Sequence, residues 1–409
     1  MTEIDRRSFL TQSAGAIAAV SLLPTLGLAG MRLAAPVSVG VIGLGRQGRA
    51  IIAELSGIEG VTIGAICDTD DRRLRAGERR ARGAKTHQDA RFVLEDPAID
   101  AVCIATPTHQ HRELAEAALA AGKHVYLEAP MAHTIEDCQA ITRAARASDR
   151  VFQPGVHARS DPVYQLARTF FRSDAVRDLV SMSAVRARKT TWRTPSSDPA
   201  RERELNWRLN PELSTGLAGE WGTHQFEVFQ WYLDRFPVSV SGYGDIRLHK
   251  DGREIADTIA CALTFDDGAR LDYNATLANS YEGMHELFRG TNASIKLAWS
   301  HGWMFKEADA PTQGWEVYAN RQQFHNDEGI TLIAGATKLA EQGKLKEGVG
   351  LPYTPLRYAL QDFLKSCAEG TPPVTSAEDG MRATIVGILA DQAVREKTTI
   401  SIDPGLMRA

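Results

Sequence analysis

The stretch Val37-Ser-Val-Gly-Val-Ile-Gly43-Leu-Gly45-Arg-Gln-Gly48 decides the fold of this chain of 409 residues. Its first half is a short apolar run rich in β-branched residues, which predicts a buried strand. Its second half has the G-x-G-x-x-G spacing and opens a helix-compatible stretch, Arg46 to Leu55. Such a turn lets the backbone approach a pyrophosphate, which the free N–H groups of the following helix can bind. The stretch therefore predicts a dinucleotide site.

A carboxylate follows the second predicted strand, Val61 to Cys67. Asp68 lies 20 residues after Gly48, where it can accept the ribose hydroxyls and disfavour a 2′-phosphate. We therefore expect NAD, with NADP possible because Arg72 and Arg73 lie close in sequence. A glycine turn without a ligand is the alternative interpretation. The residues of the turn that are expected to bind the cofactor are Gly43, Leu44, Gly45, Arg46, Gln47 and Gly48.

Apolar runs alternate with helical patterns over residues 36–158. This alternation predicts a doubly wound, mostly parallel Rossmann sheet, the α/β class of fold. The strands are expected at Val37–Ile42, Val61–Cys67, Ala101–Ala105, His124–Leu127 and Val151–Val156, and the helices include Arg46–Leu55, Glu113–Ala121 and Ile135–Ala147.

Residues 159–409 have a different pattern, with long segments of period-two alternation. Thr258–Phe265 and Ala269–Leu277 flank Asp266-Asp267-Gly268, a tight hairpin signal. We expect an α+β substrate domain with an open, mainly antiparallel sheet. Helices are expected at Thr223–Leu233, Thr331–Gln342 and Ala377–Val394, the last packing back onto the body.

Residues 1–30 resemble a twin-arginine export signal. Arg6-Arg7-Ser8-Phe9-Leu10 precedes a weakly apolar run, Ala14 to Ala29, that Pro24 interrupts. The run is too short to span a bilayer comfortably, and Gly27-Leu28-Ala29 offers small residues for cleavage. We expect a periplasmic protein with no stable membrane anchor after cleavage. An amphipathic N-terminal helix is the alternative.

Charge and cysteine content exclude several classes of protein. The formal net charge is −4, so no basic surface indicates nucleic-acid binding. None of the five cysteines stands in a C-x-x-C pair, and nothing suggests a metal site. Cys67 and Cys103 end strands between which the first strand of a Rossmann sheet would lie, so we expect no disulfide between them.

Five motifs resemble the Gfo/Idh/MocA family of glucose–fructose oxidoreductase and inositol dehydrogenase, over essentially everything from Val37 onward. They are Gly43–Gly48, Ala105-Thr-Pro-Thr-His109 with His111, Ala121-Gly-Lys-His-Val-Tyr-Leu-Glu-Ala-Pro130, Trp207-Arg-Leu-Asn-Pro211 and Gly219-Glu-Trp-Gly-Thr-His-Gln-Phe-Glu227. The resemblance implies sugar or cyclitol substrates, a substrate sheet facing the nicotinamide, and a dimer or tetramer. It adds Thr106, Pro107, His109, His111, Glu128, Ala129 and Pro130 to the expected cofactor-binding residues.

One departure from the family bears on mechanism. Members of the family typically carry Glu-Lys-Pro, whose lysine assists proton transfer at the reacting hydroxyl. This chain has Glu128-Ala129-Pro130 there, and the methyl group of Ala129 cannot transfer a proton. The resemblance then makes His224 the leading catalytic candidate, because imidazole titrates near neutral pH. Glu220 stands where the family commonly has an aspartate, and Lys189, expected on a strand, could supply the missing proton function. A buried structural histidine is the alternative for His224.

Further residues are candidates for binding the substrate. Arg159, Trp207, Arg208 and Tyr281 could hold or stack a sugar together with His224, and His285 is expected in a polar loop near Tyr281. For each of these, a surface or packing role is the alternative. His109 and His111 follow the strand that ends at Ala105 and could instead cap the next helix.

Export constrains the chemistry, because the periplasm has no nicotinamide pool known to recycle the cofactor. We therefore expect a tightly held NAD(P) that is regenerated within the catalytic cycle. Three interpretations follow: an oxidoreductase acting on a sugar, a glycosidase or lyase that oxidises its sugar transiently, and a sugar- or nucleotide-binding protein without catalysis. The missing lysine favours the second, and the breadth of the family's redox chemistry favours the first.

Overall fold

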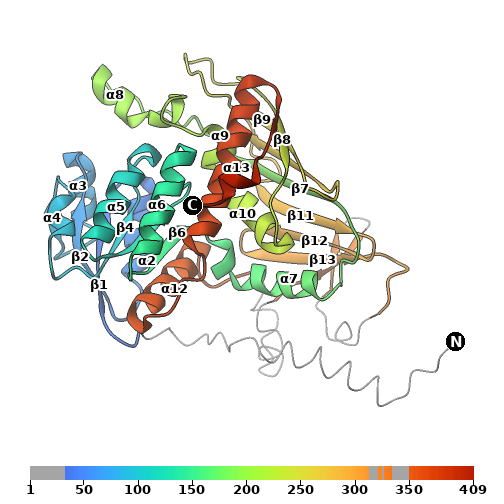
Figure 1. The fold of residues 1–409 in the computed structure, drawn as a ribbon, viewed down its shortest axis with the longest axis horizontal. Coiled ribbons are helices and arrows are strands. Elements are labelled where there is room, and N and C mark those ends of the chain that lie inside the picture. The colour runs from blue at the N-terminus through green and yellow to red at the C-terminus, as the bar shows by residue number, and fades with distance from the viewer. Residues whose placement is uncertain (1–32, 313–320, 325–326, 334–349) are drawn as a thin grey trace.

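The computed structural model describes residues 33–312, 321–324, 327–333 and 350–409. The predicted export signal, residues 1–30, lies outside the described residues, as do residues 334–342 of the helix expected from Thr331. Thr331 itself ends strand β15 (Asp327–Thr331), so that helix does not begin there. Figure 1 shows two parts side by side, a sheet flanked by helices and a larger sheet with helices packed against it.

The first part is the predicted Rossmann domain. Its six strands run in the order β3-β2-β1-β4-β5-β6, and every neighbouring pair is parallel. Because β1 lies between β2 and β4, Cys67 and Cys103 are separated as expected, and all five cysteines are free. The elements are β1 (Val37–Ile42), α2 (Arg46–Leu55), β2 (Val61–Cys67), α3 (Asp71–Glu78), β3 (Lys85–His87), α4 (Arg91–Leu94), β4 (Ala101–Ile104), α5 (His111–Ala120), β5 (His124–Glu128), α6 (Ile135–Ala147) and β6 (Phe152–Gly155).

The central strands of this sheet, β1 and β4, are largely apolar and buried because both faces are covered. In β4, Ala101 and Cys103 belong to a core shared with α2, whereas Val102 and Ile104 belong to a core shared with α5 and α6. Successive side chains of a strand point to opposite faces, so each face receives alternate residues. Helix α12 (Pro355–Glu369), from the far end of the chain, completes the first core through Leu360 and Phe363.

The second part contains a ten-stranded sheet in the order β14-β15-β13-β12-β11-β7-β10-β9-β8-β16. The pair β7 and β10 is parallel, and the other pairs are antiparallel, which confirms the predicted mainly antiparallel sheet. Its strands are β7 (Leu179–Ala187), β8 (Ser239–Asp245), β9 (Thr258–Thr264), β10 (Arg270–Thr276), β11 (Met284–Gly290), β12 (Ala293–Ala298), β13 (His301–Lys306), β14 (Arg321–Phe324), β15 and β16 (Thr399–Ser401).

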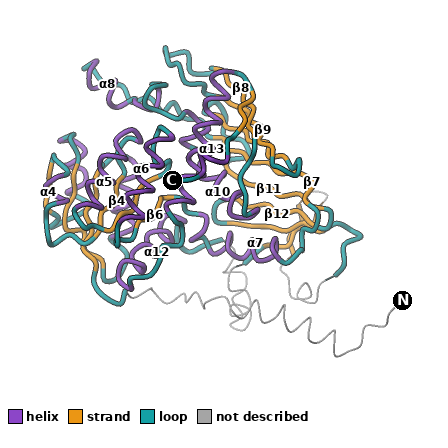
Figure 2. The backbone as a smooth tube through the Cα atoms, in the orientation of Figure 1, coloured by secondary structure: helices purple, strands orange, loops and turns teal. Residues whose placement is uncertain are grey.

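Helices cover one face of this larger sheet, as the tube in Figure 2 shows. They are α7 (Pro162–Arg172), α9 (Gly216–Glu220), α10 (Gly222–Leu233) and α13 (Ala377–Glu396), while α8 (Pro199–Leu205) lies apart from them near α3. Along β10, Leu271, Tyr273 and Ala275 are buried, whereas Arg270, Asp272 and Asn274 are exposed. The predicted dimer or tetramer stays a prediction.

Two sequence-based expectations are confirmed in this part. The hairpin between β9 and β10 turns at Asp266-Asp267-Gly268, where Gly268 has a φ of +86°. Helix α13 packs on β8, α10 and α6, and therefore ties the two parts of the molecule together. None of the helices in the described ranges is both long and apolar enough to cross a membrane.

Candidate active site

The glycine turn Gly43–Gly48 leaves an open space at the start of α2, which we call the cofactor cradle. Gly43 has a φ of +92°, and a Cβ there would lie 2.7 Å from the backbone of Ala105. A Cβ at Gly48 would lie 1.8 Å from the carbonyl oxygen of Gly43, so helix and strand approach closely. At Gly45, in contrast, a Cβ would meet nothing within 4 Å, and no side chain caps the helix. The free N–H groups and the open space above them fit a pyrophosphate.

The ribose end of the cradle is fixed by Asp68. One oxygen of this buried carboxylate accepts the Leu44 N–H at 2.7 Å, and the other accepts the Asp70 N–H at 2.8 Å. The Asp68 side chain therefore sits directly beside the glycine turn, where the sequence places it. Asp70 caps α3 and forms an ion pair with Arg201 of α8. The ion pair joins the second part of the molecule to this end of the cradle.

The opposite end of the cradle holds polar groups at the ends of β4 and β5. Burial raises the pKa of Glu128 to about 7, and the Gln47 amide donates to its Oε1 at 3.0 Å. The Thr106 hydroxyl is buried and has no hydrogen-bond partner among the described residues. Glu128 and Thr106 therefore have hydrogen-bonding capacity left for a nicotinamide nucleotide.

His111 ties two loops together. Its Nε2 lies 3.0 Å from the Thr106 carbonyl oxygen and its Nδ1 lies 3.1 Å from the Pro130 carbonyl oxygen. The ring is buried, and burial lowers its pKa to about 4. We conclude that His111 positions the loops that carry Thr106 and Pro130 rather than reaching a ligand. His109 is less buried, and its ring lies 5.9 Å from that of Trp207.

Glu220 connects the two parts of the molecule at the edge of the cradle. Its buried carboxylate accepts the Thr108 hydroxyl at Oε1, 3.1 Å, and the Arg208 guanidinium at Oε2, 2.9 Å. The Arg208 guanidinium lies 4.5 Å from the centre of the Trp207 ring. Glu220 ends a short helix, α9, so the first two residues of the Gly219–Glu227 motif are helical. The small residues of α9 permit this because they pack against α13.

His224 lies in the first turn of α10, four residues after Glu220. Its ring is half-buried and faces His157, with the ring centres 5.6 Å apart. Burial lowers the pKa of His224 well below its ordinary value, and the nearby His157 and Arg186 lower it further. The His224 imidazole is therefore neutral at physiological pH and can accept a proton.

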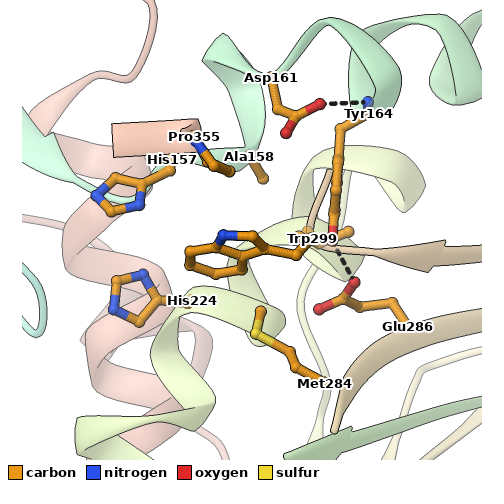
Figure 3. Close-up of a pocket in the computed structure, with 10 residues that line it drawn as sticks. His157, Ala158, Asp161, Tyr164, His224, Met284, Glu286, Trp299 and Pro355 are labelled. Atoms are coloured by element: carbon orange, nitrogen blue, oxygen red, sulfur yellow. Dashed lines mark hydrogen bonds between the residues drawn. The ribbon is translucent and has the colours of Figure 1, made fainter. Parts of the chain in front are cut away.

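A pocket opens beside His224, and Figure 3 shows the side chains around it. His157 and His224 lie at one end of the pocket, Tyr164 and Glu286 at the other, and the Trp299 ring lies between them. The lining residues are His157, Ala158, Asp161, Tyr164, His224, Val228, Met284, Glu286, Trp299 and Pro355. Within the described ranges, no group of three or more His, Cys, Asp or Glu side chains is arranged to hold a metal ion.

Models of known protein families match both parts of the chain. An oxidoreductase family model with an NAD-binding Rossmann fold matches residues 37–156, and the C-terminal α/β domain of the same family matches residues 183–402. The chain belongs to the Gfo/Idh/MocA oxidoreductase family. Its NAD-binding domain confirms the cofactor that Asp68 and the glycine turn predict.

Individual relatives of this Gfo/Idh/MocA protein agree with that assignment. Myo-inositol 2-dehydrogenase of Thermotoga maritima is 24% identical, over 89% of this chain and 98% of the relative. A solved levoglucosan dehydrogenase in complex with NADH and L-sorbose superposes with a TM-score of 0.73 and 20% identity, over 90% of this chain and 99% of that one. A glycosyl hydrolase family 109 protein of Shewanella amazonensis is 34% identical, but over 37% of this chain and 38% of the relative.

Three of the predicted site residues do not line the pocket beside His224. Arg159 is bound by Glu227 and, at 3.0 Å, by Asp379, so its guanidinium is already neutralised. Lys189 is exposed and follows β7, which ends at Ala187, so the expectation that it lies on a strand is wrong. Tyr281 is 81% exposed. None of these three side chains lines the pocket.

The structure adds residues that the sequence did not indicate. His157, Asp161, Glu286 and Trp299 line the pocket but come from three separate places in the chain. His157 and Asp161 flank the short turn after β6, Glu286 lies in β11, and Trp299 follows β12, so no single motif contains all four. His285, expected in a loop, lies in β11 and is buried, and its neighbour Glu286 points to the pocket side of the sheet. The alternation along β11 is the one signal that could have separated them.

Proposed function

We propose that the protein oxidises a hydroxyl group of a sugar or cyclitol with NAD, and that His224 takes the proton from that hydroxyl. The observation that carries this proposal is the position of His224. Its ring lines the pocket, and it follows Glu220, whose carboxylate binds Thr108 beside the carboxyl end of β4. Ligands of doubly wound sheets bind at that edge, which supports a base close to the bound cofactor.

The chemical state of His224 supports its role as a base. A base must be unprotonated before it acts, and burial together with the Arg186 cation keeps the imidazole neutral. Its ring has no hydrogen-bond partner among the described residues that would occupy the nitrogen needed for catalysis. Ala129 offers no proton-transfer group, and the exposed Lys189 does not line the pocket. His224 is therefore the side chain best placed to accept the proton.

The cofactor would be held by residues whose arrangement fits it. Backbone N–H groups at Gly45 to Gln47 would bind the pyrophosphate, Asp68 the adenosine ribose, and Glu128 with Thr106 the nicotinamide nucleotide. When bound, NAD supplies a hydride acceptor. Trp207 and Arg208 stack on one another beside Glu220, and His109 packs on the Trp207 ring.

We also propose that the protein is exported by the twin-arginine route and keeps its cofactor through repeated cycles. The ion pair between Arg201 and Asp70 supports this retention, because it fastens α8 across the ribose end of the cradle. The carboxylate of Asp70 lies two residues after Asp68, so opening this end requires the ion pair to break. Its partly buried side chains, 26% and 15% exposed, make the pair stronger than a surface pair.

A second candidate function is favoured by Ala129. Transient oxidation of a sugar hydroxyl acidifies the neighbouring C–H, a base removes that proton, and the glycosidic substituent leaves. After water adds, the hydride returns and the cofactor shows no net change. His224 could be the base in this route as well, and the partial likeness to a glycosyl hydrolase family 109 protein points the same way.

One experiment separates these functions. Purified protein is incubated with NAD and myo-inositol, levoglucosan or D-glucose, and separately with nitrophenyl glycosides. We expect net oxidation of a sugar, with NADH or a reduced second sugar as the other product. Glycoside cleavage without net NADH formation would establish the second candidate instead. Binding of sugars without any product would leave only a binding protein on the same scaffold.

A further inference from the structure

Several buried polar atoms around the His224 pocket have no partner among the described residues. Both ring nitrogens of His157, Oδ2 of Asp161 and Oε1 of Glu286 are in this state. The three residues are 8%, 1% and 0% exposed and line the same pocket. Buried polar atoms of folded proteins nearly always have a hydrogen-bond partner, ordered water included, so this concentration points to a polar occupant of the pocket: water when it is empty and a polar ligand when one is bound.

The remaining atoms of these side chains are already bound, which fixes their orientation. Oδ1 of Asp161 accepts the N–H groups of Val163 and Tyr164, at 2.8 and 3.2 Å, and caps α7. The Tyr164 hydroxyl donates to Oε2 of Glu286 at 2.7 Å. Tyr164 therefore supports both carboxylates, one through its amide and the other through its hydroxyl. Figure 3 shows both bonds at the end of the pocket away from His224.

Burial raises the pKa of Glu286 to about 7 and the neighbouring Gln225 side chain opposes that rise, but both Gln225 amide hydrogens have other acceptors. Its Nε2 donates to the carbonyl oxygens of Val185 and His285, at 3.2 and 3.1 Å. The free oxygen of Glu286 therefore still needs a hydrogen from another group.

The unmatched atoms define the chemistry of the missing group. Burial lowers the pKa of His157 to about 4, so its ring is neutral, with one donor and one acceptor. Burial raises the pKa of Asp161 and of Glu286 to about 7, so near neutral pH each free carboxyl oxygen either accepts a hydrogen or, when it is protonated, donates one. A carboxylate ligand supplies no donor, and an ammonium ligand supplies no acceptor. Hydroxyl groups do both, so neighbouring hydroxyls on one ring match the whole set.

We propose that His157, Asp161 and Glu286 form a polyol-recognition wall that binds ring hydroxyls of a neutral sugar or cyclitol away from the reacting carbon. This inference rests on the proposed function and adds its substrate specificity. The Trp299 ring lies beside this wall, 6.2 Å from the His157 ring, and gives the apolar face of a sugar ring a surface for stacking. A sugar whose ammonium or carboxylate group stands in place of a hydroxyl at this wall is disfavoured, because that group leaves part of the wall unmatched.

The first test is the ligand preference of the NADH-loaded protein, measured by isothermal titration calorimetry. The probes are D-glucose, myo-inositol, D-glucosamine and D-glucuronate. We expect a neutral polyol to bind about tenfold or more tightly than the ammonium or carboxylate sugar, as the loss of one matched hydrogen bond implies. Tighter binding of D-glucosamine or D-glucuronate overturns the inference, and so does the absence of binding by both neutral probes.

The second test uses variants that preserve the fold. Asp161→Asn keeps the cap of α7, Glu286→Gln keeps the Tyr164 hydrogen bond, and His157→Phe keeps the ring. Each should weaken binding of the preferred neutral probe by about tenfold or more. His249→Phe, in the same part of the molecule but outside the pocket, is the matched control and should bind normally. Unchanged binding by all three wall variants contradicts the assignment.

Deoxy sugars separate recognition from a general structural role. In the wild type, one of the 2-, 3-, 4- or 6-deoxy analogues of D-glucose should bind about tenfold more weakly than D-glucose. In the matching wall variant that difference should disappear, because the partner of the hydroxyl is gone. If the loss of affinity caused by the deoxy analogue and the loss caused by the variant simply add in every combination, the inference is overturned. NAD reduction by these sugars without such coupling would leave the proposed oxidoreductase function intact, whereas no NAD reduction by any sugar would remove that function.

Discussion

The hydroxyl of Thr108 donates a hydrogen bond to Oε1 of Glu220 at 3.1 Å, across the junction of the two sheets. Thr108 follows β4 in the Rossmann domain, and Glu220 precedes His224 in the substrate domain. The other oxygen of Glu220 holds Arg208. Glu220 is therefore committed to protein contacts on both oxygens, which makes it a positioning residue for His224 rather than a proton-transfer group.

Thr108→Val should lower kcat/KM for the best sugar substrate by about 3- to 10-fold, because it removes one hydrogen bond and keeps the shape. The effect should fall on kcat more than on the affinity for NAD, since the cradle itself is unchanged. Steady-state kinetics measure both. Thr142→Val, a buried threonine of α6 whose hydroxyl bonds within its own helix, is the control. Equal losses in both variants would remove the special role of the Thr108–Glu220 bond.

The His224 imidazole should stay neutral from pH 8 down to pH 6.5. Its pKa is lowered by burial and by the charge of Arg186, so protonation begins only below the ordinary histidine value. Heteronuclear NMR of the ring, assigned by the signal lost in His224→Ala, follows this titration directly. Arg186→Gln should move the midpoint upward, because a nearby positive charge is removed. A wild-type midpoint at or above 6.5 would contradict the proposed base.

Arg201→Ala should speed the loss of bound cofactor. The variant breaks the ion pair with Asp70 that fastens α8 across the cradle, and NADH should then dissociate several-fold faster. The change in NADH fluorescence after dilution into excess NAD gives the dissociation rate of NADH. Glu204→Gln is the matched control, since it removes the other partner of Arg201 and leaves Asp70 in place. If both variants release NADH at the wild-type rate, α8 is not a retaining element.

Asp68→Asn should shift cofactor preference toward NADP. The carboxylate repels a 2′-phosphate, and asparagine retains an oxygen that can accept the Leu44 N–H. The ratio of kcat/KM for NAD to that for NADP should fall by about tenfold, in line with the loss of one charged interaction. A ratio that does not change would mean that Asp68 serves only to hold the glycine turn.

The Rossmann half could be predicted almost residue by residue, because its elements are encoded locally. Ile135–Ala147 and Arg46–Leu55 have the predicted bounds, whereas the helix predicted at Glu113–Ala121 runs from His111 to Ala120. The three-residue strand Lys85–His87 is too short to show a period, so the sequence does not predict it. The substrate pocket is different. Asp161 and Glu286 meet only through the packing of α7 on the large sheet, and this contact leaves no spacing in the sequence.

Two misplaced candidates show the same limit. The charge of Arg159 fits a sugar ligand, but Glu227 and Asp379 neutralise its guanidinium. Asp379 lies in α13, more than 200 residues further along the chain. Lys189 ends a basic run, yet the strand stops two residues earlier and Lys189 is exposed to solvent. Charge type alone therefore does not locate a side chain when its partner comes from a distant element.

The central claim is that a sugar in the pocket beside His224 passes a hydride to NAD lying on the Gly43–Gly48 turn. A single-turnover measurement tests it directly: protein loaded with NAD is mixed with excess substrate sugar, and NADH absorbance is followed. We predict a burst that approaches one NADH per bound NAD in the wild type and is slowed at least about 100-fold in His224→Ala, which should retain its NAD. A wild-type burst that persists undiminished in His224→Ala, or no burst with sugar bound, would contradict the account.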